Sequence, residues 1–322
     1  MITTYDDFKT YVKDHIKEHL PEEYTDAKLD FSEIKKSGGT VYEALMVNLD
    51  SPEAMKIVPA LNITEAYKNF EQGTEIGEIL DRLAETRVHA TLPGEITRED
   101  IMDYGSAKGR IYPRLVNTAA NAEYLADKPH CEVEDLSLLF AVRVHEDSQG
   151  FAEAIVNDDL AGMWGVDASE LRETAMDNLS QKEPFFANIE EVLFGGGVTH
   201  MPQEEFCHIE DISPDDYSMP FYVLSNAQKT KGAVMAMDPK TMGQITDKLG
   251  DVYVIPSSVD EVLVVPKSEV DDVSRLAEMV TQVNADAVAP QDQLSNNVYE
   301  YDAENQTLTI ASEPMQDEIQ SM

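Results

Sequence analysis

Two serines that follow a predicted buried strand have the residue type that could carry out covalent chemistry. Ser257 and Ser258 stand directly after Pro256, and Asp260 and Glu261 follow within three residues. A serine hydroxyl needs a neighbouring base before it can attack at neutral pH, and this segment contains no histidine or lysine. The pattern also differs from Gly-x-Ser-x-Gly, so the simpler interpretation is a turn whose serine and aspartate side chains bond to backbone groups.

Two small groups of basic side chains could bind an anion. Lys229 and Lys231 lie near Asn226, and the second group occupies a stretch without acidic residues and consists of Lys108, Arg110 and Arg114. Ammonium and guanidinium groups pair with carboxylates and phosphates. If the two groups meet in the folded chain, they could hold a small anionic ligand. The alternative is that each group pairs with the surplus carboxylates of the protein itself.

The residue types that bind metals do not have the spacing of a metal site. His130-Cys131 and Cys207-His208 are adjacent pairs, whose side chains tend to point apart, and no Cys-x-x-Cys is present. The glycine run 195–197 lacks the Gly-Lys-Ser/Thr of a phosphate-binding loop. The sequence therefore predicts no metal and no cofactor.

Charge is the strongest compositional feature. The chain has 322 residues, and 24 Lys and Arg face 62 Asp and Glu, which gives a formal net charge of -38. Residues 1–100 hold 11 basic and 21 acidic residues, and residues 101–322 hold 13 basic and 41 acidic residues. Such a surface repels nucleic-acid phosphates and anionic lipids and favours a basic protein surface as partner. The excess acid could also mimic DNA, or simply keep the protein soluble.

Targeting signals are not evident. The N-terminal residues Met1 to Asp7 contain no basic region followed by an apolar stretch, and no apolar run approaches the ~18 residues that cross a bilayer. With only two cysteines, a disulfide framework is not expected. These features predict a cytoplasmic location.

Hydrophobic periodicity predicts an α+β fold with antiparallel hairpins, helices packed on the sheets, and two sub-domains. The first sub-domain spans 1–94, with its boundary near Leu92-Pro93-Gly94. Its predicted helices and strands are a helix over 4–20, strands at 27–33, 40–48 and 56–62, and helices over 64–70 and 75–88.

The second sub-domain spans 95–311, and an acidic tail occupies 312–322. Its predicted first half contains strands at 111–116, 136–144 and 151–156 and helices over 119–126 and from Asp167. The segment 183–220 combines acid, glycine and proline, which predicts a mobile connection. The predicted second half contains strands at 221–224, 233–237, 252–255 and 262–265, a helix from Asp238-Pro239 to Gly250, a helix capped within 268–271, and a hairpin of 298–301 with 307–310.

Several stretches are similar in sequence to a known family. They are Phe221-Tyr-Val-Leu-Ser-Asn226-Ala-Gln-Lys229, Gly232-Ala233, Val254-Ile-Pro256-Ser257-Ser258-Val-Asp260-Glu261-Val262 and Leu294-Ser-Asn-Asn-Val-Tyr299-Glu-Tyr301-Asp302. Over residues 5–310, which include Asn117 and Trp164-Gly165-Val166, the chain resembles the bacterial family catalogued as domain of unknown function 5688. The resemblance implies a shared fold in a cytosolic protein of a gut firmicute, encoded near mobile elements. Asp260 stands where the family commonly has histidine, so a mechanism that needs an imidazole there would fail.

Two hypotheses of function follow. The favoured one is a non-catalytic, acidic cytosolic interaction protein whose partner is a basic protein surface. The alternative is a hydrolase or transferase that acts on an anionic small substrate near Ser257 and Ser258. The candidate binding residues are Asn226, Lys229, Lys231, Ser257, Ser258 and Glu261. Geometry separates the two hypotheses, because an enzyme needs these groups in one pocket with a base within hydrogen-bond reach.

Overall fold

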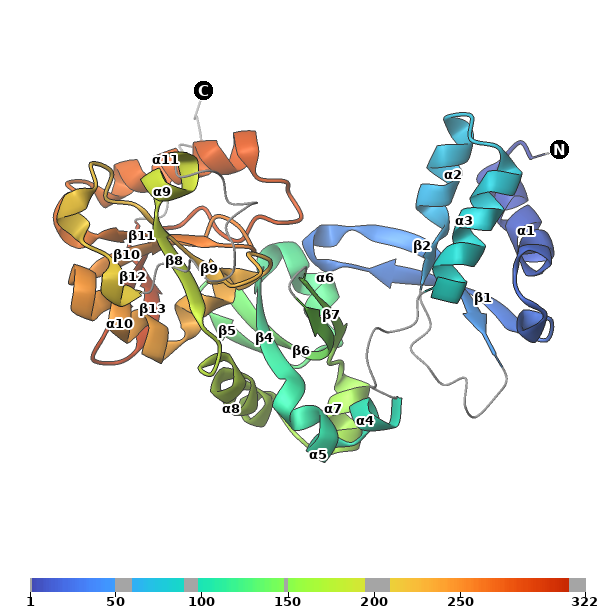
Figure 1. Cartoon of the computed structure of the whole chain (residues 1–322), viewed down its shortest axis with the longest axis horizontal. Helices are drawn as coiled ribbons and strands as arrows, with labels where there is room; N and C mark the ends of the chain where they lie inside the picture. Colours follow the sequence, from blue (N-terminus) through green and yellow to red (C-terminus); the bar gives the residue numbers. More distant parts are fainter. Residues whose placement is uncertain (1, 50–59, 90–97, 148–149, 195–208, 313–322) are drawn as a thin grey trace, which may run out of the picture. The chain divides into compact units, whose positions relative to one another are not determined.

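The computed structural model describes residues 2–49, 60–89, 98–147, 150–194 and 209–312 (Figure 1). They form two compact units, Met1–Ser106 and Ala107–Met322. The fold is α+β with antiparallel sheets, as the sequence predicts. The predicted boundary near Leu92-Pro93-Gly94 lies outside the described residues. Across the described ranges, no helix is both long and apolar enough to cross a bilayer.

The first unit packs its helices on a three-stranded antiparallel sheet of order β1-β2-β3, formed by β1 (Lys28–Lys35), β2 (Val41–Asn48) and β3 (Leu61–Asn62). The main helices are α1 (Tyr5–His15), α2 (Ile63–Glu71) and α3 (Ile76–His89), and the short helices α4 (Arg98–Met102) and α5 (Tyr104–Ala107) follow. One buried core joins the sheet to α1, α2 and α3, and it includes Phe8, Val12, Leu45, Leu61 and Leu80. The helices that supply this core are those that the sequence predicts over 4–20, 64–70 and 75–88.

The second unit contains two sheets. The first sheet has the order β4-β6-β5, with β7 paired to the far end of β6, and consists of β4 (Ile111–Asn117), β5 (His130–Val133), β6 (Leu136–Asp147) and β7 (Gly150–Ile155). The helices of this part are α6 (Ala122–Leu125), α7 (Asp158–Trp164) and α8 (Ala168–Leu179). Helix α8 packs on β4 and buries Leu171, Ala175 and Leu179, which are spaced four residues apart on one face of the helix.

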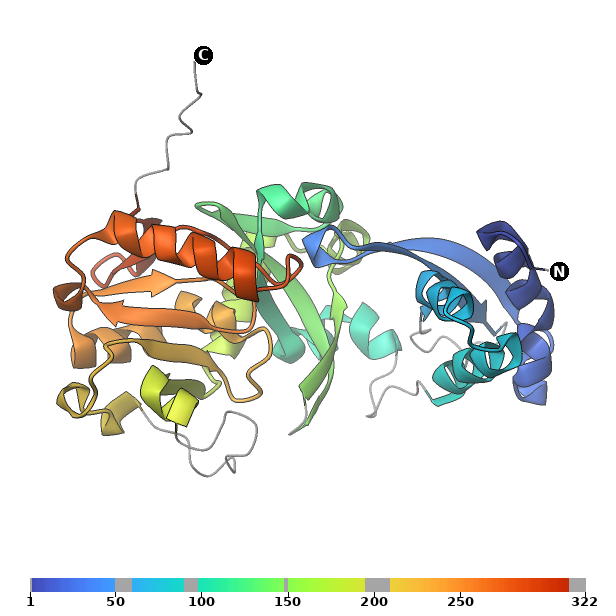
Figure 2. The same cartoon turned by 90° about the horizontal axis from the view of Figure 1, so that it is seen from above.

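The second sheet has six antiparallel strands in the order β13-β12-β10-β11-β9-β8: β8 (Pro184–Asn188), β9 (Tyr222–Asn226), β10 (Val252–Ile255), β11 (Val262–Pro266), β12 (Tyr299–Asp302) and β13 (Thr307–Ile310). Its helices are α9 (Ile189–Phe194), α10 (Pro239–Leu249) and α11 (Val273–Ala287). In Figure 2, α11 runs alongside the strands of this sheet, and its Leu276 and Val280 share a core with Ile255 and Val265.

The prediction of a mobile connection over 183–220 is wrong where the chain forms β8. Phe186 on this strand is fully buried, and β8 pairs with β9 along its whole length. Helix α9 follows β8, and short 3-10 turns lie at Ile209–Asp211 and Pro214–Asp216. Residues 195–208 of the predicted connection lie outside the described residues. The apolar run Phe185 to Ala187 is too short to stand out among the surrounding carboxylates.

Two smaller predictions are also wrong. Residues Gly232–Met237 form a 3-10 helix, η9, where the sequence predicts a strand at 233–237. The backbone N–H groups of Gly232 and Ala233 donate to loop carbonyls and not to a neighbouring strand. The cap of α11 lies one residue beyond the predicted 268–271, because the carboxylate that accepts the first backbone N–H groups of the helix belongs to Asp272.

A polar junction joins the two sheets of the second unit at the turn between β5 and β6. The carboxylate of Asp135 accepts hydrogen bonds from Ser295 Oγ at 2.7 Å, from Asn297 Nδ2 at 3.1 Å and from the Tyr299 hydroxyl. Burial, together with the nearby Asp135 carboxylate, raises the pKa of Tyr299 well above its ordinary value. Asn117 adds a bond from its Nδ2 to the carbonyl of Leu294 at 2.8 Å. The segment 294–299 therefore supplies contacts between the sheets.

The buried cap of α10 gives a test of this packing. Asp238 is 0% exposed, and its carboxylate accepts from Thr241 N at 3.0 Å, from Thr241 Oγ1 at 2.6 Å and from the Ser180 hydroxyl. We expect Asp238→Ala to lower the free energy of unfolding by about 3 kcal/mol, because it removes the cap and leaves buried donors without a partner. Asp167→Ala, at the exposed cap of α8, should cost about 1 kcal/mol. Urea unfolding of both variants measures the difference, and equal losses would show that burial of the cap adds nothing.

Candidate functional site

The loops 226–232 and 256–261, which contain the candidate binding residues, interlock through Asp260. The Asp260 carboxylate accepts the backbone N–H of Lys231 at 2.7 Å, and its carbonyl accepts the backbone N–H of Gly232 at 3.0 Å. The hydroxyl of Ser225, at the end of β9, donates to the same carbonyl at 2.6 Å. Asp260 thus has a structural role in this chain, because it holds the two loops together.

The loop 226–232 is held in an unusual backbone conformation. Lys229 and Lys231 have φ of 51° and 53°, a left-handed region that side chains with a Cβ rarely adopt. The side chain of Asn226 stabilises the turn, since its Nδ2 donates to the Thr230 carbonyl at 2.7 Å and its Oδ1 accepts the Thr230 N–H at 3.3 Å. Asn226 is therefore a loop-forming residue, and the loop holds both lysines in place.

The two serines do not form a nucleophilic site in the described structure. The Ser258 hydroxyl accepts the backbone N–H of Asp260 at 3.0 Å, and the Ser257 carbonyl accepts the backbone N–H of Leu294 at 3.2 Å. Within the described ranges, neither serine hydroxyl makes a hydrogen bond to a histidine, lysine or carboxylate side chain. Activation by a general base therefore has no support at this loop.

Lys229 and Glu261 are brought close enough to influence each other. The Lys229 Nζ lies 4.1 Å from the ring centroid of Phe185 on β8. Burial lowers the pKa of Lys229, and the Glu261 charge partly opposes this effect. Burial and the neighbouring Asp260 raise the pKa of Glu261. Partial burial is the largest cause of both pKa shifts, and each group acts on the pKa of the other in the opposite direction to its burial.

The two predicted basic groups do meet, in part, at one aromatic ring. Lys231 Nζ and the guanidinium of Arg114 each lie 5.8 Å from the ring centroid of Phe151 on β7. The guanidinium of Arg143, on β6, lies 4.3 Å from the same ring and 4.0 Å from the ring of Tyr112. Lys108, by contrast, lines a separate hollow beside α8.

Carboxylates of the same sheet neutralise most of the cations at Phe151. Arg114 forms an ion pair with Glu153, whose side chain is 2% exposed. Glu146 accepts from Arg143 Nη1 at 2.8 Å and from Lys182 Nζ at 2.9 Å. Burial acts to raise the pKa of Glu146, but Lys182 and Arg143 outweigh it and hold that pKa below its ordinary value. The pairing that the sequence left as the alternative to ligand binding is thus present.

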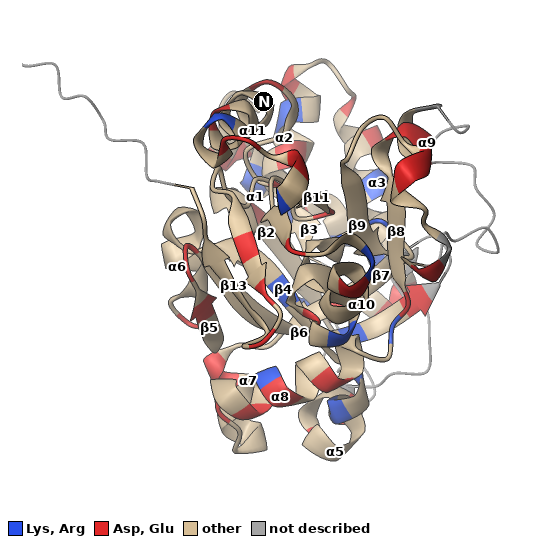
Figure 3. Ribbon diagram, turned by 90° about the vertical axis from the view of Figure 1, so that its left-hand side faces the viewer, with Lys and Arg blue, Asp and Glu red and all other residues tan. Residues whose placement is uncertain are grey.

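An acidic hollow beside α8 is the open feature that the sequence analysis missed. Its volume is about 430 Å³, and its lining consists of Lys108, Asp167, Ser169, Glu170, Glu173, Thr174 and Asp177. Four carboxylates face one lysine in this lining, and Figure 3 shows acidic residues along α8. The signal was available in the sequence, because acids spaced three and four residues apart lie on one face of a helix.

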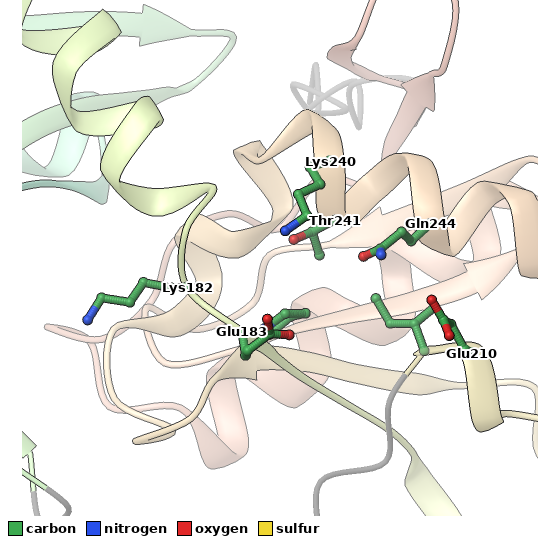
Figure 4. Close-up of a pocket in the computed structure, with 8 residues that line it drawn as sticks. Lys182, Glu183, Glu210, Lys240, Thr241 and Gln244 are labelled. Atoms are coloured by element: carbon green, nitrogen blue, oxygen red, sulfur yellow. The ribbon is translucent and has the colours of Figure 1, made fainter.

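A second cavity, of about 400 Å³, lies between the start of β8 and α10 (Figure 4), and its lining includes Glu183, Glu210, Lys240, Thr241 and Gln244. The Lys182 side chain, which also borders it, extends away from the cavity, in keeping with its ion pair to Glu146.

Among the described residues, no group of three His, Cys, Asp or Glu side chains could hold a metal ion. His130 Nδ1 lies 2.7 Å from the Lys128 carbonyl, and the Cys131 thiol donates to the Ala168 carbonyl at 3.6 Å. Cys207 and His208 lie outside the described residues.

Gly232 allows a direct test of how tightly the two loops interlock. A Cβ at this position would lie 2.2 Å from Ser225 Oγ and 2.4 Å from Asn226 N. We expect Gly232→Ala to lower the free energy of unfolding by about 3 kcal/mol, because backbone atoms must move. The matched control is Gly243→Ala within α10, where nothing lies within 4 Å and alanine should stabilise the helix by about 0.5–1 kcal/mol. Chemical unfolding of both variants gives the comparison, and a tolerated Gly232→Ala would mean that the loops are loosely packed.

Comparison with known proteins gives one match. No curated protein and no solved structure matches the chain. The model of the family of unknown function DUF5688 matches residues 5–303, which include both units and the interlocked loops. The chain therefore belongs to the DUF5688 family.

Proposed function

We propose that this chain is a non-catalytic binding protein of the bacterial cytoplasm, and that the acidic surface of its second unit binds a basic protein surface. The observation that carries the proposal is that several cations of the second unit pair within the molecule, whereas a row of its carboxylates is exposed. Arg114, Arg143 and Lys182 of the second unit are engaged by neighbouring carboxylates, while Glu170, Glu173 and Asp177 are exposed along one hollow.

Two further lysines of the second unit also pair with a carboxylate and lie against an aromatic ring. Lys267 pairs with Glu300 at 2.7 Å and lies 5.3 Å from the ring of Tyr253. Lys128 lies 4.2 Å from the ring of Tyr124 and pairs with Asp127 at 2.5 Å. With a net charge of -38, the field outside the molecule is negative and attracts a basic partner.

The alternative of a hydrolase or transferase has less support. Its substrate would be anionic, and the two arginines at Phe151 that could bind it, Arg114 and Arg143, already pair with Glu153 and Glu146. The hydroxyl of Ser258 is occupied by a backbone N–H. An anionic substrate would also approach against the charge of the whole chain.

Charge reversal on α8 tests the proposed function. We expect Glu170→Lys, Glu173→Lys and Asp177→Lys together to weaken binding of a fluorescein-labelled lysine- and valine-rich peptide by about tenfold or more, because the hollow becomes cationic. Association of the peptide with the unchanged protein should slow steeply as salt rises past about 0.1 M. Stopped-flow fluorescence measures both effects.

The matched control reverses three exposed acids of the first unit, Glu22, Glu23 and Asp26, and so makes the same change in net charge. This control should weaken peptide binding by no more than about threefold, since the long-range field alone is affected. Equal losses of peptide affinity in the two triple variants would show that the peptide has no preferred binding surface and that the acidic residues act only through the net charge. Unfolding midpoints of both variants are needed alongside, because relief of self-repulsion changes stability.

A further inference from the structure

Strand β13 forms an open edge of the six-stranded sheet. It pairs with β12 from Tyr299 opposite Ile310 to Asp302 opposite Thr307, and within the described part of the chain no strand pairs with its other side. An open edge exposes backbone donors and acceptors that can accept a further strand. No lysine or proline protects this edge, since β13 reads Thr-Leu-Thr-Ile.

The register shows which backbone groups point outward. The backbone N–H of Ala311 donates to the carbonyl of Val298 at 2.8 Å. Because bonded and non-bonded pairs alternate in an antiparallel ladder, Thr307 and Thr309 direct their backbone groups toward β12. Leu308 and Ile310 therefore direct their N–H and C=O groups to the open side.

A cavity of about 360 Å³ lies beside this edge, between β13 and the hairpin of β5 and β6. Its apolar lining consists of Val133, Leu138, Met176, Ala236, Met237 and Leu308, and its charged lining consists of Glu132, Glu134 and Arg172. Apolar walls of this size accept an aliphatic side chain, and two carboxylates against one guanidinium favour a cationic neighbour.

Helix α8 contributes to both the cavity and the surface of the proposed function. Arg172 and Met176 of α8 line the cavity, and Glu170, Glu173 and Asp177 of the same helix line the acidic hollow. The negative charge of α8 therefore favours a basic partner at the cavity as well as at the hollow.

We propose that an extended basic segment of a partner protein pairs with β13 as an added strand. One apolar side chain of the segment enters the cavity beside Met176, Met237 and Leu308, and a lysine or arginine next to it contacts Glu132 and Glu134. The inference rests on the proposed function and specifies the conformation of the partner: backbone pairing supplies affinity, and alternate side chains supply specificity.

The test uses full-length protein and two synthetic ten-residue peptides of alternating lysine and valine. The second peptide has the same charge but is N-methylated at its four central residues, so it cannot donate to a strand edge. We expect N-methylation to weaken binding by about tenfold or more. Ile310→Pro, which removes one outward N–H, should weaken binding of the first peptide by a similar factor, while Ile310→Val should change it by less than about twofold.

The outcomes separate this inference from the proposed function. Salt-sensitive binding that is equal for both peptides would overturn the strand-pairing inference and leave the acidic surface intact. Failure of both peptides to bind at any salt would contradict the proposed function itself. If Ile310→Pro does not fold, the comparison of the two peptides on the unchanged protein still decides the matter.

Discussion

The second unit depends on the Asp135 carboxylate, which a tight turn places between two sheets. Its two oxygens accept bonds from Ser295, Asn297 and Tyr299, and the Asp135 carbonyl accepts the backbone N–H of Thr118 at 2.9 Å. A part-buried carboxylate is costly unless its lone pairs are satisfied, so these donors must stay together. Their position determines how β12 meets β5 and β6, and therefore forms the cavity beside β13.

This arrangement changes the interpretation of the family motifs. Segments that the sequence offers as a nucleophile, Ser257-Ser258, or as an anion-binding group, Asn226 to Lys231, fasten loops of one sheet to each other. The segment Leu294 to Tyr299 fastens that sheet to its neighbour. Because these polar groups are used within the molecule, we place the proposed partner at the hollow beside α8 and at the edge of β13 instead.

Local signals in the sequence were sufficient for most helices and hairpins. Helix α10 is an example, since Asp238 caps it, Pro239 begins it and Gly250 ends it as predicted. Strand β8 was missed because its burial comes from pairing with β9, which no local pattern reveals. The sequence could not show that Lys231 and Arg114 both lie at Phe151, because tertiary packing brings together these residues, which are more than a hundred positions apart in the chain.

A double-mutant cycle at the junction tests the central claim that the family motif holds the two sheets together. Free energies of unfolding are measured for Asp135→Ala, Tyr299→Phe and the double variant. The account predicts a coupling of about 1–3 kcal/mol between these two residues. The control cycle combines Tyr299→Phe with Asp302→Ala, since Asp302 is an exposed acid of the same strand. In this cycle the two losses of unfolding free energy should add within about 0.5 kcal/mol. Additive losses for Asp135 and Tyr299 would contradict the account.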